Sequence, residues 1–291
     1  MNPKVTIGMC GRNCANIVGY ALESVAQQDF PHDQMEIVFV DDGSEDNTLN
    51  VVKECFSRMD ISARIFSDEW RGLGKARNTV IYNALGDYIV WVDTDEILTR
   101  DFVRKQTNLI DQNPKAGIVA GKLGILDDEN LILTLELLPS VVEYSRQDWT
   151  SESKLPGTGG ATYRVAAARE VGGFDEEISG VGEDIDIALR IKKSGWLILR
   201  GEGVFYEKHG HLSSWVSLLK RSVNQGVQSR LLYTRTNKFY SLSRMNPFAS
   251  MVASVFYAVN GYKVTGRKIV FLLPPHFSLK MLAWFYGFTK S

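Results

Sequence analysis

Short apolar runs alternate with segments of helical periodicity along the first half of the chain. Runs rich in β-branched residues predict four strands, at residues 4–9, 35–40, 63–66 and 87–92. Apolar residues recur at helical spacing between these runs and predict helices over residues 17–28, 48–59 and 74–85. Strands that alternate with helices in this way predict an α/β fold, with a mostly parallel central sheet and helices on both of its faces.

The second half of the pattern is less regular. A helix is expected over residues 98–113 and a strand over residues 118–123. A Gly-rich loop at residues 154–160 precedes a last amphipathic helix, which begins after Gly182.

Acidic residues follow two of the predicted strands. Asp41 and Asp42 end the second strand, and Asp93 and Asp95 come directly after the fourth. Ligands bind beyond the carboxyl ends of the strands in open parallel sheets, so both clusters fall where a site is expected. Two carboxylates one residue apart, such as Asp93 and Asp95, are able to reach one divalent cation, and Mg²⁺ or Mn²⁺ prefers such oxygen ligands. The alternative for either cluster is an ordinary acidic turn.

The run GLGKAR, which ends at Arg77, is close to the dinucleotide-binding fingerprint but does not match it. Arg77 stands where the third glycine is needed, and the run does not follow the first strand. We therefore reject a nicotinamide site and expect Arg77 and Asn78 to face a phosphate or the acidic loop.

Two further polar groups are candidates for chemistry. Glu183 and Asp184 open a helix, where the helix dipole alone would favour them, but a carboxylate at this position is also suited to act as a general base. His209 and His211 lie two residues apart, a spacing that places both rings on one face of a strand and suits a metal or a diphosphate. The alternative for the histidines is a polar strand exit.

The net charge of −1 is a cancellation between two parts of the chain. Residues 208–291 hold 12 of the 33 Lys and Arg residues, 14 of the 31 aromatic residues and none of the 34 Asp and Glu residues. The balanced total excludes a strongly basic protein that binds nucleic acid.

Three cysteines without a CxxC pair predict neither a disulfide framework nor a zinc knuckle, and the N-terminus lacks a signal-peptide pattern. We therefore expect a reduced, cytoplasmic setting.

The carboxyl-terminal part predicts a second region, residues 241–291, after a catalytic region of residues 1–240. Residues 245–262 carry no charge, but the Asn, Ser, Pro and Gly residues among them make a membrane span unfavourable. Aromatic residues beside Lys and Arg favour a helical segment at a membrane interface, peripheral on the cytoplasmic face. The alternative is an amphipathic tail packed on the catalytic body or on a second copy of the chain in a homodimer.

Five stretches, taken in order, resemble the inverting glycosyltransferases of family 2, which have the GT-A fold and use nucleotide sugars. They are VTIGMCGRNCANIVGYALESVAQQDF, EIVFVDDGSEDNT, GLGKARNTVIYNALGDYIVWVDTDEIL, GGFDE and GEDIDIALRIKKSGW. The resemblance covers about residues 4–200, and HGHLSSWVSLLKRSVNQG extends it to about residue 226. One departure is Glu96, where many relatives have a second Asp after the pair, and we expect little effect from it.

The resemblance implies how the donor would bind. Asp41 and Asp42 would contact the base and ribose of the nucleotide, and Asp93 would lie by the ribose and diphosphate. Asp95 would bind Mg²⁺ or Mn²⁺, with one of the two histidines completing the metal shell. The family favours a UDP-sugar as the donor, with GDP- and dTDP-sugars as alternatives.

The resemblance also implies the reaction. Asp184 would remove the proton from an acceptor hydroxyl, Glu183 would orient the acceptor, and Gly159 and Gly160 would form the floor under the donor sugar. The acidic pair favours a hydroxyl of a saccharide or lipid-linked saccharide over a polyprenyl or dolichyl phosphate, because a phosphate is already anionic and needs no base. Alternatives from other classes are a sugar nucleotidyltransferase and a catalytically silent protein that binds nucleotide sugars.

Overall fold

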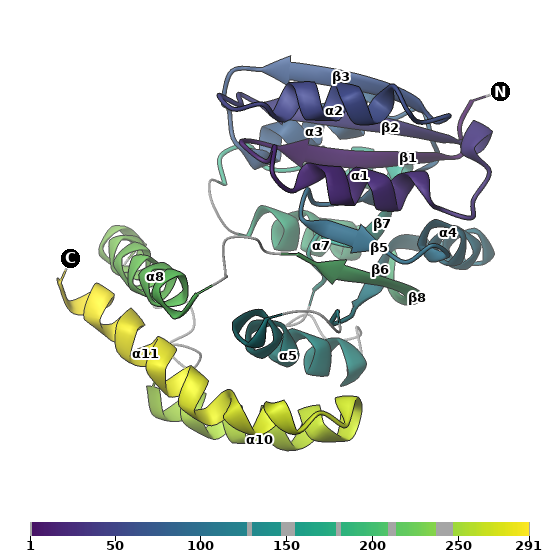
Figure 1. Cartoon of the computed structure of the whole chain (residues 1–291). Helices are drawn as coiled ribbons and strands as arrows, with labels where there is room; N and C mark the ends of the chain where they lie inside the picture. Colours follow the sequence, from purple (N-terminus) through teal and green to yellow (C-terminus); the bar gives the residue numbers. More distant parts are fainter. Residues whose placement is uncertain are drawn as a thin grey trace. The chain divides into compact units, whose positions relative to one another are not determined.

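The computed structural model describes residues 2–126, 130–146, 155–178, 182–208, 214–236 and 247–290, which belong to two compact units (Figure 1). The first unit consists of residues 1–124 and 147–208 and contains the sheet. The second consists of residues 125–146 and 209–291, and its described elements are helices. The boundary expected between residues 240 and 241 stays a prediction, because residues 237–246 lie outside the described part.

One sheet of eight strands forms the centre of the first unit as far as the structure describes it. The strands are β1 (Val5–Gly11), β2 (Met35–Asp42), β3 (Ser62–Asp68), β4 (Tyr88–Trp91), β5 (Glu96–Leu98), β6 (Ala116–Leu123), β7 (Ala161–Arg164) and β8 (Leu197–Glu207). Their order across the sheet is β3-β2-β1-β4-β7-β6-β8-β5. The first four strands run parallel, as do β6 and β8, whereas β7 is antiparallel to both of its neighbours and β5 is antiparallel to β8. The mostly parallel sheet is therefore confirmed, and its second half is mixed.

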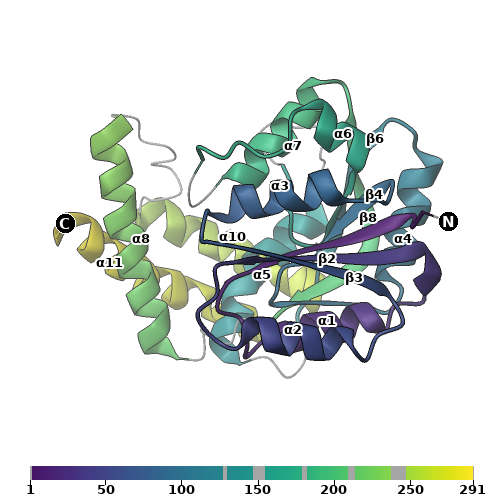
Figure 2. The same ribbon diagram turned by 90° about the horizontal axis from the view of Figure 1, so that it is seen from above.

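Helices cover both faces of this sheet, as predicted. The helices of the first unit are α1 (Val18–Ala26), α2 (Thr48–Phe56), α3 (Leu73–Asn83), α4 (Phe102–Gln112), α6 (Val165–Glu170) and α7 (Glu183–Lys193). Figure 2 shows α1 and α2 on one side of the sheet and α3, α6 and α7 on the other. Trp91 fills the core beneath α3 and makes edge-to-face contacts with Tyr163 and Phe174, at 6.2 and 5.7 Å between ring centroids. This core supports the end of β4 from which the acidic turn emerges.

The second unit packs its helices closely. They are α5 (Leu131–Arg146), α8 (Trp215–Thr236), α10 (Pro247–Thr265), the short 3₁₀ helix η2 (Lys268–Leu272) and α11 (Leu273–Lys290). A Cβ atom at Gly226 of α8 would lie 2.1 Å from the carbonyl oxygen of Trp284, and one at Gly287 of α11 would lie 2.1 Å from that of Val223. The backbones of α8 and α11 therefore touch at two glycines, a contact that any larger side chain would prevent.

A small apolar core joins α5 to the carboxyl-terminal helices. It is made of Leu135, Leu138, Ala258, Val270 and Leu273. In the part of the chain that the structure describes, one helical stretch, residues 268–290, is long and apolar enough to cross a membrane by length and composition, and 17% of its apolar window is buried.

A buried ionic cluster connects α5 to α11. Glu136 of α5 accepts hydrogen bonds from His276 Nε2 at 2.6 Å and from Lys280 Nζ at 2.6 and 2.7 Å. Burial alone would raise the pKa of Glu136, but these two partners outweigh it and lower that pKa to about 2. The cluster supplies a counter-charge to a basic segment that carries no carboxylate of its own.

We expect Glu136→Gln to destabilise the protein at neutral pH by on the order of 2 kcal/mol, because it leaves Lys280 without its carboxylate partner. The folded-state pKa lies below the ordinary value of 4.5, so the contribution is present above that value and is lost as pH falls towards about 2. Thermal unfolding followed by circular dichroism from neutral to acidic pH measures this difference. Equal stability of the two proteins at neutral pH would contradict the assignment.

Candidate active site

Acidic side chains from two strands lie on either side of the end of β1. Asp41 and Asp42 end β2, and Asp93 and Asp95 follow β4, while β1 pairs with both strands. Cys10 of β1 lies between them: burial raises the pKa of its thiol to about 12, and Asp93 and Asp42 act in the same direction. The thiol is therefore protonated at neutral pH and is unsuited to be a nucleophile. The topology thus brings the two acidic clusters to one end of the sheet.

Asp42 organises the loop between β3 and α3. Its carboxylate accepts hydrogen bonds from the backbone N–H groups of Arg71 at 2.8 Å and Gly72 at 3.1 Å. Gly72 has a φ of +93°, which favours glycine. Trp70, in the same loop, is 64% exposed and carries the guanidinium of Arg12 over its ring at 5.2 Å. An indole ring is thereby held at the surface of this end of the sheet.

Asp41 is almost completely buried and only partly satisfied. Its Oδ2 atom accepts hydrogen bonds from the backbone N–H of Ser44 at 3.1 Å and from the Ser67 hydroxyl at 3.4 Å. Among the described residues, its Oδ1 atom has no hydrogen-bond partner. A buried acceptor without a partner costs free energy, so Oδ1 is available to accept a hydrogen bond from a ligand.

Arg77 of α3 joins the two sides of the site. Its buried guanidinium donates to Glu183 Oε1 at 2.7 Å and to Asp93 Oδ1 at 3.4 Å, and it lies over the Phe174 ring at 5.5 Å. Arg77 therefore faces the acidic loop directly. One buried cation bridges the acidic turn after β4 and the first turn of α7.

Asn78 has a different role from the one expected. It does not face the acidic loop but fastens the turn at residues 172–176: its Nδ2 donates to the Phe174 carbonyl and to Glu176 Oε1, both at 2.9 Å, and its Oδ1 accepts the Phe174 N–H at 2.7 Å. A Cβ atom at Gly173, which has a φ of +73°, would lie 2.4 Å from Asn78 Oδ1. The turn is thus held against α3 and keeps Phe174 beside Arg77.

Glu96 links the acidic turn to the Gly-rich loop. Its buried Oε2 atom accepts hydrogen bonds from the backbone N–H groups of Asp93 at 3.0 Å and Gly160 at 3.1 Å. A Cβ atom at Gly159 would lie 2.3 Å from Glu96 Oε1 and 3.5 Å from Asp93 Oδ2. Burial, together with the charge of Asp93, raises the pKa of Glu96 well above its usual range. The glycines expected to line the donor site therefore do lie against the acidic turn.

The first turn of α7 brings its two carboxylates to the same place. Glu183 is buried and paired with Arg77, whereas Asp184 is half-buried. Asp184 Oδ1 accepts the N–H of Ile185 at 2.7 Å, and a Cβ atom at Gly157 would lie 2.8 Å from Asp184 Oδ2. Burial and the charge of Glu183 raise the pKa of Asp184, which makes its carboxylate a better proton acceptor than an ordinary Asp.

Asp95 lies where the end of β8 meets the acidic turn. The N–H of Lys208 donates to the carbonyl oxygen of Asp95 at 2.6 Å. Burial and the charges of Asp95 and Glu207 raise the pKa of Asp93, against the opposing effect of Arg77. The carboxylates therefore repel one another, and a cation at this position would relieve the repulsion.

The donor atoms at this turn suit a hard divalent cation, because they are carboxylate oxygens. Within the described ranges, however, no three His, Cys, Asp or Glu side chains gather as a metal-binding group. His209 and His211, expected to complete the metal shell, lie outside the described residues.

The site also contains a cavity and further unpaired polar atoms. A cavity of about 190 Å³ is lined by residues 70–75 at the start of α3 and by Glu176, Ile178 and Glu183. Two buried side-chain atoms lack a hydrogen-bond partner in the described part of the chain: Thr158 Oγ1 in the Gly-rich loop and Glu183 Oε2 in the first turn of α7. These features are typical of a site that binds a polar ligand.

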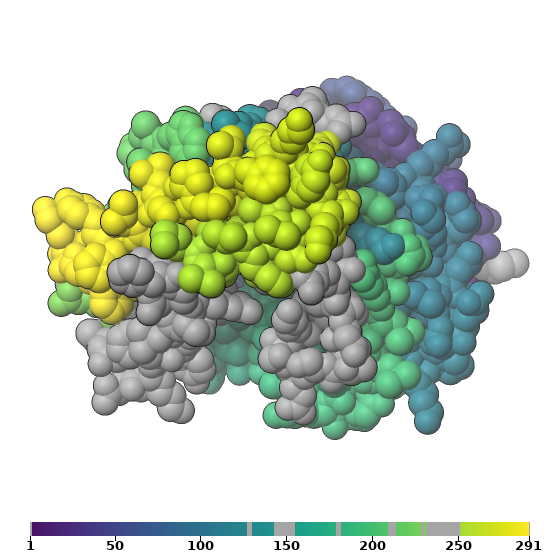
Figure 3. All heavy atoms as spheres, turned by 90° about the horizontal axis from the view of Figure 1, so that it is seen from below, coloured from purple at the N-terminus to yellow at the C-terminus, as the bar shows by residue number. Residues whose placement is uncertain are grey.

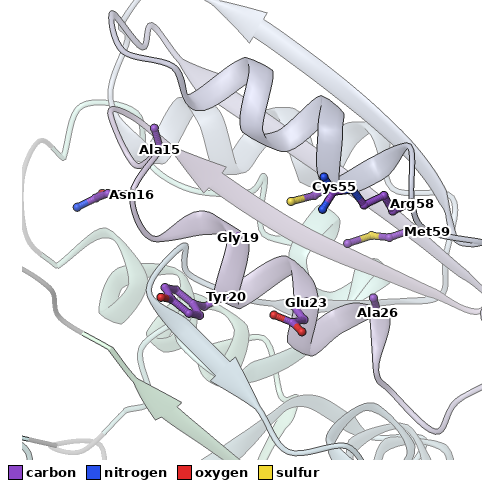
Figure 4. A pocket seen from close by; sticks show the side chains of 9 residues that line it. All are labelled: Ala15, Asn16, Gly19, Tyr20, Glu23, Ala26, Cys55, Arg58 and Met59. Atoms are coloured by element: carbon purple, nitrogen blue, oxygen red, sulfur yellow. The ribbon is translucent and has the colours of Figure 1, made fainter.

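A larger cavity, of about 450 Å³, lies between α1 and α2 (Figure 4). Tyr20 and Glu23 line it from α1, and Cys55 lines it from α2. None of the predicted site residues lines this cavity. The predicted site residues that the structure describes lie instead at the strand ends, beside the smaller cavity.

Sequence reasoning gave little weight to Glu96 and did not identify Trp70. In the sequence, Glu96 directly precedes the apolar pair Ile97-Leu98. This pattern favours a strand at Glu96 over a solvated turn, and the structure shows β5 there. The signal for Trp70 was a large aromatic residue in a polar run between a strand and a helix, where binding residues are often found.

Comparison with known sequences gives one family and several relatives. The model of the family described as glycosyl transferase family 2 matches residues 6–172. Poly(ribitol-phosphate) beta-N-acetylglucosaminyltransferase TarS of Staphylococcus aureus is 30% identical over 101 residues, which are 35% of this chain and 18% of TarS. Probable glycosyltransferase YdaM of Bacillus subtilis is 24% identical over 205 residues, which are 67% of this chain and 48% of YdaM. The matches thus span half or less of the length of these relatives.

Solved structures show the same fold. The mannosyltransferase PcManGT from Pyrobaculum calidifontis, in complex with GDP-Man and Mn²⁺, superposes with a TM-score of 0.66 at 20% identity, over 100% of this chain and 88% of that one. TarS residues 1–349 of S. aureus, in complex with UDP, gives a TM-score of 0.58 at 18% identity, over 98% and 89% of the two chains. The fold is therefore the GT-A-like α/β fold that the sequence predicts.

We expect Arg77→Met to destabilise the protein by about 3–5 kcal/mol, because it leaves the buried Glu183 carboxylate without its partner. Combining it with Glu183→Gln should cost clearly less than the sum of the two single changes. Urea unfolding of the four proteins in this cycle measures the coupling. The control is Glu54→Gln, which removes an exposed pair with Arg58 and should cost less than about 1 kcal/mol. Additive effects at Arg77 and Glu183 would show that the buried pair has no special role.

Proposed function

The chain belongs to glycosyl transferase family 2, and we propose that it transfers a sugar from a nucleotide sugar, with a UDP-sugar as the favoured donor, to an acceptor hydroxyl. One observation carries the proposal: Arg77 bridges Asp93 and Glu183. It joins the acidic turn proposed to hold the donor to the helix proposed to hold the base. A sugar bound at the turn would thus lie beside the carboxylates that act on the acceptor.

The donor is proposed to bind along the ends of β2 and β4. The unpaired Oδ1 atom of Asp41 is suited to accept an N–H of the nucleotide base, and Asp42 holds the adjacent loop in place. Asp93 would lie by the ribose and diphosphate. Gly159 and Gly160 would support the sugar, because their lack of side chains lets the backbone approach closely. The complexes of TarS with UDP and of PcManGT with GDP-Man support this class of donor.

A divalent cation, Mn²⁺ or Mg²⁺, is proposed at the acidic turn. Asp95 would hold it with Asp93, and His209 or His211 is a candidate third ligand. When bound, such a cation offsets the negative charge of a leaving diphosphate. The Mn²⁺ in the PcManGT complex supports this assignment.

The transfer is proposed to be a single displacement with inversion. Asp184 accepts the proton of the acceptor hydroxyl, and the hydroxyl oxygen forms a bond to the anomeric carbon. The bond from that carbon to the diphosphate breaks, and its electron pair stays on the diphosphate oxygen. Glu183 uses its unpaired Oε2 atom to accept a hydrogen bond that orients the acceptor, while Arg77 holds its other oxygen.

The acceptor is proposed to be a saccharide or a lipid-linked saccharide. Asp184 has a raised pKa, which suits it to deprotonate a hydroxyl. A phosphate acceptor is already anionic and would require no such base. The free thiols of Cys10, Cys14 and Cys55 support a reducing, cytoplasmic setting for the reaction.

Ligand-induced stabilisation tests the donor class. We expect UDP with Mn²⁺ to raise Tm by several degrees, more than GDP or dTDP does, because a ligand at a hundred times its Kd stabilises the folded state by about 3 kcal/mol. Chelation with EDTA should remove most of the shift, and Asp95→Asn should abolish its dependence on Mn²⁺. A larger shift with GDP would replace the favoured donor, and no shift with any nucleotide would overturn the proposed donor site.

Asp184→Asn tests the base. We expect sugar transfer to fall by about 10²–10⁴-fold, because the amide cannot accept the proton, while the UDP-induced shift in Tm is kept. The acidic limb of the pH–rate profile should disappear in this variant. Asp186→Asn, on the same helix, serves as the control and should keep near-normal activity. Unchanged transfer by Asp184→Asn would refute the base, and release of pyrophosphate instead of a nucleoside diphosphate would indicate a nucleotidyltransferase.

A further inference from the structure

The carboxyl-terminal helices of the second unit expose their apolar side chains. Figure 3 shows α10 and α11 side by side on the face seen from below. Large apolar residues of both helices are 39–70% exposed; on α10 they are Met251, Val252, Val255, Phe256, Val259, Tyr262 and Val264, and on α11 they are Leu279, Leu282, Phe285 and Tyr286. We call this set the apolar face. An apolar surface built from two neighbouring helices is unusual on a protein surrounded by water.

Most of the fully buried positions of the same helices carry small or polar side chains. Among residues 251–265 of α10, the buried positions are Ser254, Ala258 and Gly261. On α11 they are Leu273, His276 and Gly287, with Lys280 also turned towards Glu136, and Tyr257 of α10 and Phe277 of α11 pack partly buried against the same core. A helix packed on a water-soluble body shows the reverse arrangement, with its apolar stripe inwards. On these two helices, more large apolar side chains therefore face outwards than inwards.

Positive charge lies beside the apolar face at the α10–α11 connection and at the end of α11. Lys263, Arg267 and Lys268 lie at the connection between α10 and α11, and Lys290 ends α11. Residues 208–291 contain no Asp or Glu. A surface with apolar and aromatic side chains edged by cations is complementary to an anionic lipid surface, where each basic residue adds to the binding.

The ionic cluster on α11 indicates that this helix lies on a membrane surface and does not cross the membrane. Lys280 and His276 stand in the middle of the stretch that is long enough to cross a membrane, and both are paired with Glu136 of α5. A crossing helix would have to carry these polar groups to the bilayer centre, where charged side chains are costly. Lying in the interface keeps the cluster on the protein side and the apolar face on the lipid side.

We propose that α10 and α11 form a monotopic membrane-binding surface, which inserts its apolar face into one leaflet of an anionic membrane without crossing it. The helices lie in the plane of the interface, with the cations at the level of the lipid headgroups. This inference rests on the second unit alone and not on the sugar-transfer reaction.

Sedimentation of the full chain with lipid vesicles tests the surface. We expect binding to vesicles of phosphatidylcholine mixed with phosphatidylglycerol and much weaker binding to phosphatidylcholine alone. The double variant Phe256→Asp/Phe285→Asp should bind about a hundredfold more weakly, because each lost aromatic contact with the lipid accounts for roughly a factor of ten. Leu85→Asp, an exposed apolar residue of the first unit, is the matched control and should bind like the unchanged protein.

A charge variant provides a second measurement that does not alter the apolar face. Lys263→Gln/Lys268→Gln replaces two exposed cations and should weaken binding to the anionic vesicles by about thirtyfold. Circular dichroism of each variant confirms that it folds. Equal vesicle binding by the unchanged protein and by Phe256→Asp/Phe285→Asp would overturn the proposal. It would also be overturned if the unchanged protein is a dimer and the double Asp variant is a monomer, because a second copy of the chain would then cover the apolar face.

Alkaline carbonate extraction of cell membranes that contain the full chain tests the orientation. We expect the protein to be released into the soluble fraction, because a helix in the interface is held by one leaflet only. Retention in the membrane pellet would overturn the monotopic arrangement in favour of a crossing helix.

Discussion

The buried guanidinium of Arg77 is the group on which the arrangement of the site depends. Asp93 and Glu183 come from distant parts of the chain, and their like charges oppose placing them at one end of the sheet. A cation between them makes the arrangement favourable, and burial strengthens the attraction because the surrounding dielectric is low. Phe174 covers one side of the guanidinium, and Asn78 holds the turn that carries Phe174. Three separate segments are therefore positioned relative to one planar charge on α3.

Close backbone approach is the second constraint. Gly157 leaves room for Asp184, and Gly159 leaves room for Glu96 and Asp93, so one loop lies against both Asp184 and the acidic turn. Glu96 fixes that loop by accepting hydrogen bonds from Asp93 and Gly160. A methyl group at either glycine would push the loop away from the carboxylates. The Gly-rich sequence thus determines the width of the site rather than its flexibility.

The sequence allowed the first half of the fold to be predicted because β1 and β2 are long and buried and because strands and helices alternate regularly there. β1, β2 and their helices carry uninterrupted apolar patterns, and strand topology alone places Asp41 and Asp93 at one end of the sheet. β5 and β7 have only three and four residues, and their pairing partners decide their conformation. The roles of Asn78 and Glu96 depend on residues far away in the sequence, so no local pattern could reveal them. The stretch at α5 is apolar like a core helix, and only the three-dimensional structure assigns it to the second unit.

The position of α5 has a consequence for how such a protein could evolve. The chain enters the second unit twice, first at residues 125–146 between two strands of the sheet and again from residue 209 onwards. Leu135 and Leu138 of α5 pack on Ala258, Val270 and Leu273 of the later segment. The second unit is therefore not a module that a gene fusion could add at the end of a finished catalytic domain. An exchange of the carboxyl-terminal segment between relatives would leave this core mismatched unless residues 125–146 changed with it.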